Sequence, residues 1–171
     1  ANINFVKNRL SKYNNSFFKL GCVSTWSSKC GIASYSKHIF TESEDDVLIF
    51  SPIEEQDSVL DEHIIPSWNI GFDQSNLSLL ESKIIDNNIS SLIIQFNYGF
   101  FDLKQLSDFI FRLKAANINV IFILHSTSDP ILSLEKKLTL LTDAFKVCER
   151  LIVHSINDLN RLKKYGLVDN V

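Results

Sequence analysis

The sequence has 171 residues, of which 45% are hydrophobic and 22% charged, and its formal net charge is −3. These values are typical of one soluble globular domain, and no apolar run reaches the roughly 20 residues that a transmembrane helix needs. The 17 Lys and Arg residues do not outnumber the 20 Asp and Glu residues, so a nucleic-acid partner is not expected.

Short apolar runs bounded by turn residues predict six β-strands. Runs such as Ser91–Phe96 and Asn119–Leu124 do not alternate apolar and polar residues, which is typical of strands covered on both faces in a parallel sheet. The predicted strands are Leu20–Val23, Val47–Phe50, His63–Ile65, Ser91–Phe96, Val120–Leu124 and Leu151–Val153.

Amphipathic helical patterns separate these strands. Apolar residues recur every three or four positions over Leu103–Leu113 and again over Leu134–Phe145. Strands that alternate with such helices predict an α/β fold with a Rossmann-like, doubly wound, mostly parallel sheet over residues 19–171. Residues 1–18 are predicted to form an N-terminal helix or arm. The carboxylate-rich stretch Ile53–Glu62 is interpreted as a surface loop, with an acidic binding site as the alternative.

Cysteine and histidine spacing favours reduced thiols and gives no metal site. Cys22, Cys30 and Cys148 form no CxxC pair and have no histidine at a metal-ligand spacing. His38 and His63 have no carboxylate or cysteine placed to complete a metal site. We therefore expect a cytoplasmic protein with no metal and no other cofactor.

The loop after the first strand contains one glycine, Gly31, at the start of an amphipathic helix. The glycine either lets the backbone approach a ligand, with helix N–H groups that favour an anion such as a diphosphate, or is a tight-turn residue. The loop has neither the Gly-Lys-Ser/Thr element of a P-loop nor the three-glycine dinucleotide fingerprint. A nicotinamide-dependent dehydrogenase is therefore not expected.

Three further loops follow strands at the edge where doubly wound sheets bind ligands. Gln95–Phe101 is rich in aromatic residues, which either pack against a planar or sugar ring or fill the core. His125 follows the fifth strand, either as a hydrogen-bond donor or proton carrier or as a ring bonded to loop backbone. Ser155 or Asn157 can cap the helix after the sixth strand, and His154 is interpreted as structural.

Taken together, these motifs resemble the N-terminal domain of retaining GT-B glycosyltransferases, in particular glycosyltransferase family four. The resemblance covers about Lys19 to Gly166 and depends on the order of the motifs at the strand ends. The sequence differs from the family pattern at Cys30, Asn97 and Tyr98. The motifs are Lys29-Cys30-Gly31-Ile32-Ala33, Gln95–Phe101, Leu124-His125-Ser126-Thr127, and Arg150–Ser155 followed by Leu162 and Gly166.

This resemblance implies a function and a set of site residues. The chain would be the acceptor-side half of an enzyme that moves a sugar from a nucleotide-sugar donor to a saccharide or lipid-linked acceptor. His125 would lie near the transferred sugar as the catalytic residue. The other implied positions are Gly31 and Ile32 at the donor diphosphate, Asn97, Tyr98, Ser126 and Asp129 at the acceptor or sugar, and Ser155 at a helix N-terminus near the ligand.

The same resemblance implies that part of the enzyme is missing from this chain. In that family a C-terminal nucleotide-sugar domain supplies most donor recognition, and 171 residues leave no room for it. The sequence also contains no methionine. We therefore expect a fragment of a longer polypeptide that is nearly inactive alone. The alternative is a non-catalytic Rossmann-like module that binds a carbohydrate or a protein through an exposed aromatic loop near Tyr98.

Membrane association is a separate expectation, because this family often docks on membranes to reach lipid-linked acceptors. Four cations lie among apolar residues between Asn2 and Lys19, which fits a basic amphipathic helix. The same pattern fits a plain surface helix packed on the sheet. The expected location is therefore cytoplasmic, with peripheral membrane binding as the open alternative.

Overall fold

The computed structural model describes residues 19–41, 47–55, 61–71, 77–131, 133 and 135–171. Within them, six strands form one sheet in the order β3-β2-β1-β4-β5-β6, and every neighbouring pair is parallel. This α/β, Rossmann-like, doubly wound sheet confirms the predicted fold class. The predicted arm over residues 1–18 lies outside the described residues.

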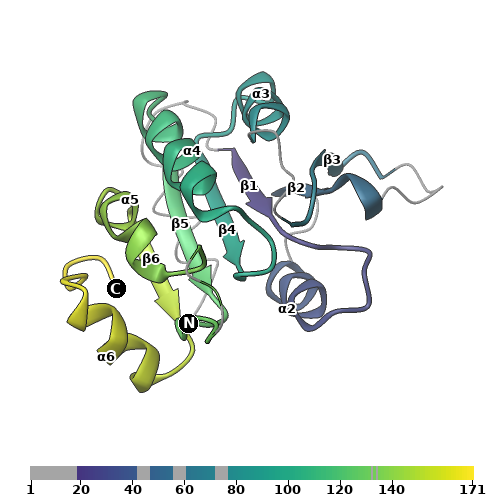
Figure 1. The fold of residues 1–171 in the computed structure, drawn as a ribbon. Helices are drawn as coiled ribbons and strands as arrows, with labels where there is room; N and C mark the ends of the chain where they lie inside the picture. Colours follow the sequence, from purple (N-terminus) through teal and green to yellow (C-terminus); the bar gives the residue numbers. More distant parts are fainter. Residues whose placement is uncertain (1–18, 42–46, 56–60, 72–76, 132, 134) are drawn as a thin grey trace.

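The elements alternate along the chain as the sequence predicts (Figure 1). The strands are β1 (Leu20–Val23), β2 (Val47–Pro52), β3 (Ile64–Trp68), β4 (Ser91–Phe96), β5 (Asn119–Leu124) and β6 (Arg150–Val153). The helices are α2 (Gly31–Phe40), α3 (Ser78–Asp86), α4 (Leu103–Ala115), α5 (Thr142–Lys146) and α6 (Ile156–Lys164), with 3-10 turns η2 (Ile53–Glu55) and η3 (Leu138–Leu141).

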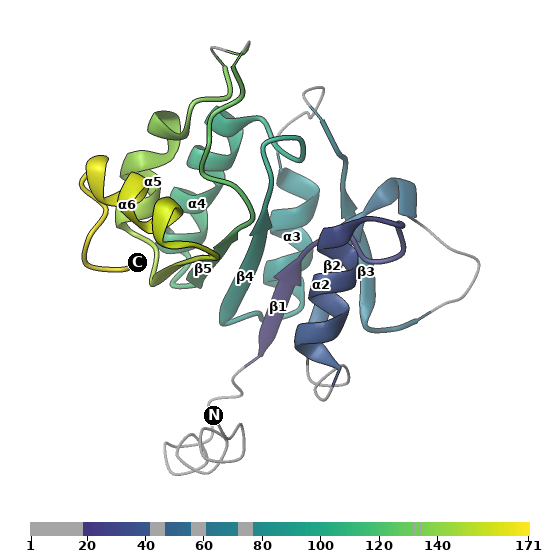
Figure 2. The same ribbon diagram turned by 90° about the horizontal axis from the view of Figure 1, so that it is seen from below.

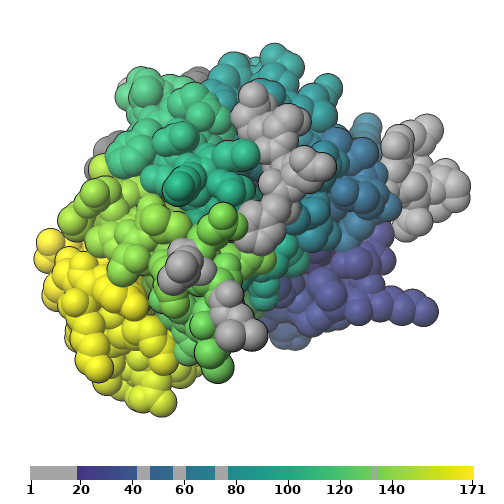
Figure 3. Space-filling model, viewed as in Figure 1, coloured from purple at the N-terminus to yellow at the C-terminus, as the bar shows by residue number. Residues whose placement is uncertain are grey.

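The two faces of the sheet are covered unequally. Helix α2 lies on one face, and α3 and α4 lie on the other (Figure 2). In the space-filling view the latter face is covered by the α3, α4 and α5 segments, with α6 in yellow at one corner (Figure 3). The larger core cluster includes the predicted stripe of α4, which buries Leu103, Leu106, Phe109, Ile110 and Leu113.

The face under α2 is apolar at one end and polar at the other. Its small core cluster contains Cys22, Trp26, Phe40, Val47 and Ile49. Successive strand side chains point to opposite faces, so Gln95 lies opposite Phe96, which packs in the larger cluster. Gln95 is fully buried, as are Ser24 after β1 and Ser36 on α2. Polar groups therefore concentrate under α2 near the carboxyl ends of the strands.

The predicted helix over Leu134–Phe145 was wrong at its start. The helical segment begins with η3 at Leu138 and continues into α5, and Leu134 lies outside the described residues. The backbone N–H of Leu138 donates to a carboxylate oxygen of Asp129 at 2.8 Å. This bond satisfies the first N–H of η3, so the helical segment begins at Leu138 although the periodic pattern starts upstream of it.

The predicted strand His63–Ile65 was too short and began one residue early. The carbonyl of His63 accepts a bond from Ile49, but β3 runs on through Pro66 to Trp68. The indole N–H of Trp68 donates to the carbonyl of Phe50 at 2.8 Å, which holds this end of β3 beside β2. Proline is tolerated here because β3 lies at the sheet edge and needs no donor on its outer side.

The opposite edge strand, β6, also has a backbone partner outside the sheet. The N–H of Leu151 donates to the carbonyl of Asn170 at 2.7 Å. The side-chain amide of Asn170 in turn donates to the carbonyls of Phe145 and Cys148, each at 2.8 Å. The segment around Asn170 is thereby fastened to both β6 and the end of α5.

Candidate functional site

Three aromatic rings meet at the carboxyl edge of the sheet, on the α2 side. His125 follows β5, His154 follows β6 and Tyr35 lies on α2. The ring centroids of the two histidines are 5.0 Å apart, and Tyr35 lies 5.0 Å from His125 and 5.2 Å from His154. Because Leu124 pairs with Val153 in the sheet register, the histidines that follow them are neighbours.

The ring of His125 is bonded to a side chain and not to loop backbone. Its Nε2 lies 2.7 Å from Oε1 of Gln95. A carbonyl oxygen only accepts hydrogen bonds, so this contact places the ring proton on Nε2 and leaves Nδ1 as an acceptor. The predicted alternative of a backbone-bonded ring was therefore wrong.

The environment of His125 keeps its ring neutral. Burial, and secondly the nearby His154, lower the pKa of His125 from 6.5 to about 4. The ring is thus a neutral hydrogen-bonding group at pH 7. The lowered pKa does not favour the predicted role of proton carrier near neutral pH. The amide nitrogen of the fully buried Gln95 has no hydrogen-bond partner among the described residues.

The loop between β1 and α2 holds a carboxylate from another part of the chain. The backbone N–H groups of Trp26 and Ser27 donate to Oε2 of Glu55 at 2.7 and 3.1 Å. The N–H of Ser28 donates to Oε1 of the same side chain at 3.2 Å. Glu55 belongs to the stretch interpreted from sequence as a surface loop, so its role was missed. No sequence motif signals it, because the contact depends on the bend of a distant loop.

Gly31 and Ile32, the predicted donor-diphosphate positions, lie at the start of α2. Gly31 is exposed, and a Cβ added to it would meet no atom within 4 Å. Its φ is not positive, so no turn requires glycine here and the tight-turn interpretation was wrong. The space around Gly31 is open to a ligand or to a larger side chain.

Cys30 caps helix α2. Its Sγ accepts from the N–H of Ala33 at 3.4 Å and lies 3.1 Å from the hydroxyl of Thr25. Partial burial raises the pKa of Cys30, but hydrogen bonds from Ser28, Thr25 and the backbone of Ala33 and Ile32 outweigh it, so the net shift is downward. A half-buried thiol at a helix N-terminus with a lowered pKa has the features of a reactive cysteine.

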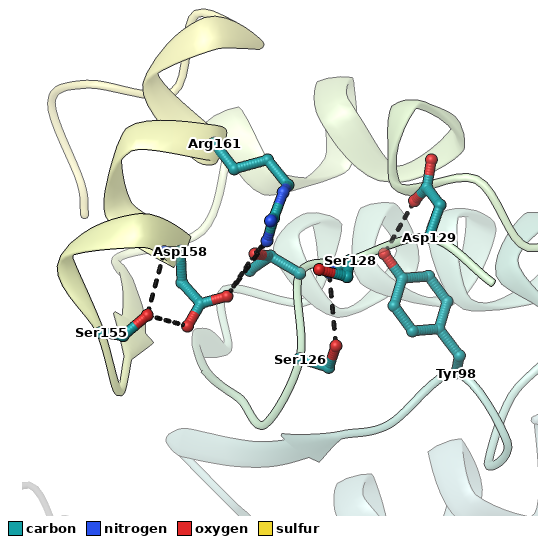
Figure 4. Close-up of polar contacts among 8 residues, drawn as sticks. Tyr98, Ser126, Ser128, Asp129, Ser155, Asp158 and Arg161 are labelled. Carbon is teal, nitrogen blue, oxygen red and sulfur yellow. Dashed lines mark hydrogen bonds and ion pairs between the residues drawn. The ribbon is translucent and has the colours of Figure 1, made fainter. Parts of the chain in front are cut away.

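The aromatic segment after β4 is part of the core. Tyr98 is only 6% exposed, and its hydroxyl donates to Asp129 at 2.9 Å (Figure 4). Burial and the carboxylate of Asp129 raise the pKa of Tyr98 well above its usual range. Phe101 is 2% exposed and stacks on Trp68 at 5.1 Å. These buried rings confirm the interpretation of this segment as part of the core, and the prediction of an exposed aromatic loop near Tyr98 was wrong.

Two other predicted sugar-contacting side chains are engaged within their own loops. Oδ1 of Asn97 accepts from the N–H of Gly99 at 2.8 Å. The hydroxyl of Ser126 accepts from the N–H of Ser128 at 3.3 Å (Figure 4). The structure therefore places both near the carboxyl edge in turn-forming roles.

The N-terminus of α6 is capped by the hydroxyl of Ser155, and the carboxylate of Asp158 bonds to that hydroxyl. Ser155 is the N-cap, as the sequence predicts, and accepts from the N–H of Asp158 at 3.2 Å. Asp158 also accepts from the buried Thr127 at 2.5 Å. It pairs with Arg161 at 3.3 Å (Figure 4). Hydrogen bonds from Ser155 and Thr127 lower the pKa of Asp158, so it is ionised at neutral pH. Both predicted anion positions, after β1 and after β6, thus carry an internal carboxylate.

Within the described ranges, no three His, Cys, Asp or Glu side chains converge in a way that could hold a metal ion. No helix in the same part of the chain is long and apolar enough to cross a membrane.

Comparison with known proteins shows no family. No protein-family model matches the sequence, and no curated protein matches it. Among solved structures, the chain is similar to the pyridoxal kinase from Entamoeba histolytica, with 13% sequence identity and a TM-score of 0.46. The match covers 88% of this chain and 62% of the kinase, so the chain spans less than two thirds of that protein's length. A likeness this weak says nothing about activity.

Proposed function

We propose that this chain is the acceptor-side domain of a GT-B glycosyltransferase that moves a sugar from a nucleotide-sugar donor to a saccharide or lipid-linked acceptor. One observation carries the proposal: a neutral His125, oriented by Gln95, stands at the carboxyl edge of the sheet. In this strand order the chain connections change direction between β1 and β4, which is where doubly wound sheets bind ligands.

In this proposal the residues act by positioning and hydrogen bonding. A neutral imidazole presents a donor and an acceptor that can hold a sugar hydroxyl without carrying charge. The open backbone at Gly31 and Ile32 would face the donor diphosphate, and no metal or other cofactor takes part. A second domain of the same polypeptide would supply most of the donor contacts, so this domain alone would be nearly inactive.

A non-catalytic carbohydrate- or protein-binding module is the second candidate. It is favoured by two internal acceptors at the predicted anion positions: the Glu55 carboxylate accepts from the amides after β1, and the Ser155 hydroxyl accepts from the N–H of Asp158 in the first turn of α6. Its binding surface would be the ring cluster of Tyr35, His125 and His154, because the rings of Tyr98 and Phe101 are buried.

Transfer activity of the polypeptide that contains this domain distinguishes the two candidates. His125→Asn should lower turnover at least about 100-fold if the ring positions the sugar. The matched control is His38→Asn, which changes an exposed histidine of α2. Equal turnover in both variants would remove His125 from the site. Absence of transfer from every nucleotide sugar, together with saturable saccharide binding at His154, would establish the binding module instead.

Peripheral membrane binding remains a part of the proposal that depends on residues 1–18, which lie outside the described residues. Liposome flotation of the chain with and without these residues tests it. Flotation that is lost with the segment supports membrane docking, and identical flotation of both forms contradicts it.

A further inference from the structure

The carboxylate of Glu55 sits where three consecutive backbone N–H groups converge. We propose that Glu55 is an internal competitor for a phosphate-type oxyanion, and that this anion binds the amides of Trp26, Ser27 and Ser28 only when Glu55 leaves them. The proposal concerns regulation of the loop after β1. It depends on the proposed function only for the idea that the natural anion belongs to a nucleotide.

The geometry of the loop is that of an anion receptor. Successive backbone N–H groups that point into one concavity bind anions without help from side-chain charge. Here the three donors reach the two oxygens of one carboxylate at 2.7 to 3.2 Å. The anion comes from η2, 27 to 29 residues away in the sequence, so the loop does not form the contact from its own side chains.

The contact has the features of one that can be exchanged. Ser27 is exposed, and Ser28 and Glu55 are half-buried, so the amides of these two serines can be reached once the carboxylate moves, while Trp26 is buried. No described Lys or Arg forms an ion pair that would hold Glu55 in place. Nothing among the described contacts of Glu55 therefore anchors it other than the three amides themselves.

The charges around the loop favour a phosphate over a carboxylate. Lys29 belongs to the loop and is exposed. Nζ of Lys37, in the last turn of α2, lies 5.7 Å from the centroid of the Trp26 ring. A phosphate group carries about −1.5 to −2 at neutral pH and three strong acceptor oxygens, so it gains more from these cations than a single carboxylate does.

The test measures inorganic pyrophosphate binding to the whole 171-residue chain by ¹⁵N NMR, following the amides of Trp26, Ser27 and Ser28. Glu55→Ala removes the competitor. Glu54→Ala is the matched control, because it removes the same charge from an exposed neighbour in η2, while the three loop amides donate to Glu55. We expect Glu55→Ala to bind pyrophosphate at least about tenfold more tightly than the wild-type chain, since affinity scales with the fraction of free sites. Glu54→Ala should match the wild type.

Two results would overturn the proposal. One is unchanged pyrophosphate affinity at these amides in Glu55→Ala, and the other is an equal gain in Glu54→Ala, which would reveal a general charge effect. If Glu55→Ala fails to fold, Glu55→Gln decides, because its amide keeps an acceptor but loses the charge and should give an intermediate affinity. Inorganic phosphate and UDP as further probes separate a simple oxyanion from a nucleotide. Pyrophosphate binding by this chain, with no sugar transfer by the longer polypeptide that contains it, would refute the glycosyltransferase and leave this inference standing.

Discussion

The hydroxyls of Ser24 and Ser36 lie 2.7 Å apart, and both residues are fully buried. Ser24 follows β1 and Ser36 lies on α2, so this hydrogen bond fastens the helix to the carboxyl end of the central strand. Tyr35, the preceding residue, is thereby held against His125. The bond connects the loop that holds Glu55 to the ring cluster, through the helix that begins just after that loop.

The first prediction concerns the ionisation of His125. An NMR titration of the native chain should give a midpoint near 4, because burial and His154 disfavour the charged ring. His154→Asn should raise that midpoint toward 6.5, since it removes the neighbouring charge. A midpoint of 6.5 in the wild-type chain would contradict the buried, neutral ring.

The same shift predicts a pH dependence of stability. The pKa of His125 is lower in the folded chain than in the unfolded chain, so the unfolded chain binds more protons between these values. The stability that the neutral His125 contributes is fully present above about pH 6.5. It is lost as the pH falls through the folded-state pKa of about 4. The free energy of unfolding, measured with urea between pH 4 and 7, should rise less with pH for His125→Asn than for the wild type.

Two glycines are predicted to respond oppositely to the same substitution. A Cβ on Gly21 of β1 would lie 2.7 Å from the ring of Phe50 and 3.0 Å from Leu92. Gly21→Ala should therefore lower the free energy of unfolding by about 1–3 kcal/mol through overpacking. A Cβ added at Gly31 would meet no atom within 4 Å, so Gly31→Ala should raise the free energy of unfolding by about 0.5 kcal/mol. Denaturant titration checks both, and equal effects would contradict the packing argument.

A substitution at Thr127 tests the network at the start of α6. Thr127→Val keeps the shape of a fully buried residue but removes the hydroxyl that donates to Asp158 and accepts from Arg161. We expect a loss of about 1 kcal/mol in the free energy of unfolding. The lowered pKa of Asp158 stabilises the fold above its unfolded pKa, and this contribution is lost as pH falls. The acid-unfolding midpoint of Thr127→Val should therefore move to higher pH.

Thiol labelling gives the last prediction. Cys30 is half-buried with a lowered pKa, whereas burial raises the pKa values of Cys22 and Cys148. Iodoacetamide at pH 7 should modify Cys30 first in the native chain, as read by peptide mass spectrometry. Cys30→Ser should abolish the fast phase. Fast labelling of Cys22 or Cys148 would show that those strands or helices open readily.

Much of the fold follows from local sequence, because unbroken apolar runs and leucine stripes specify buried strands and one-sided helices. The start of η3 does not, since it is set by the bond between Leu138 and Asp129 across a loop. Tyr98 shows the same limit: an aromatic residue after a strand fits a binding surface equally well, until the partner of its hydroxyl is known.

The site was predictable only where position along a strand decides it. His125 follows from the rule that ligand-facing residues lie after parallel strands, and its catalytic role stays a prediction. Gln95 was visible as a polar residue in an apolar strand, but its bond to His125 required the register of β4 and β5. Glu55 left no local signal, because its partners are backbone amides, which every sequence has.

The two outer strands of the sheet also bear on how copies of the chain meet. Open edge strands offer unpaired backbone groups to another molecule, which is a common route to aggregation. Pro66 removes one donor from β3, and Asn170 engages the N–H of Leu151 on β6. Both edges therefore offer fewer free backbone donors, so at high concentration the chain should resist edge-to-edge association. Asn170→Ala, which removes the side-chain bonds that hold this segment to the carbonyls of Phe145 and Cys148, should be the change that promotes association.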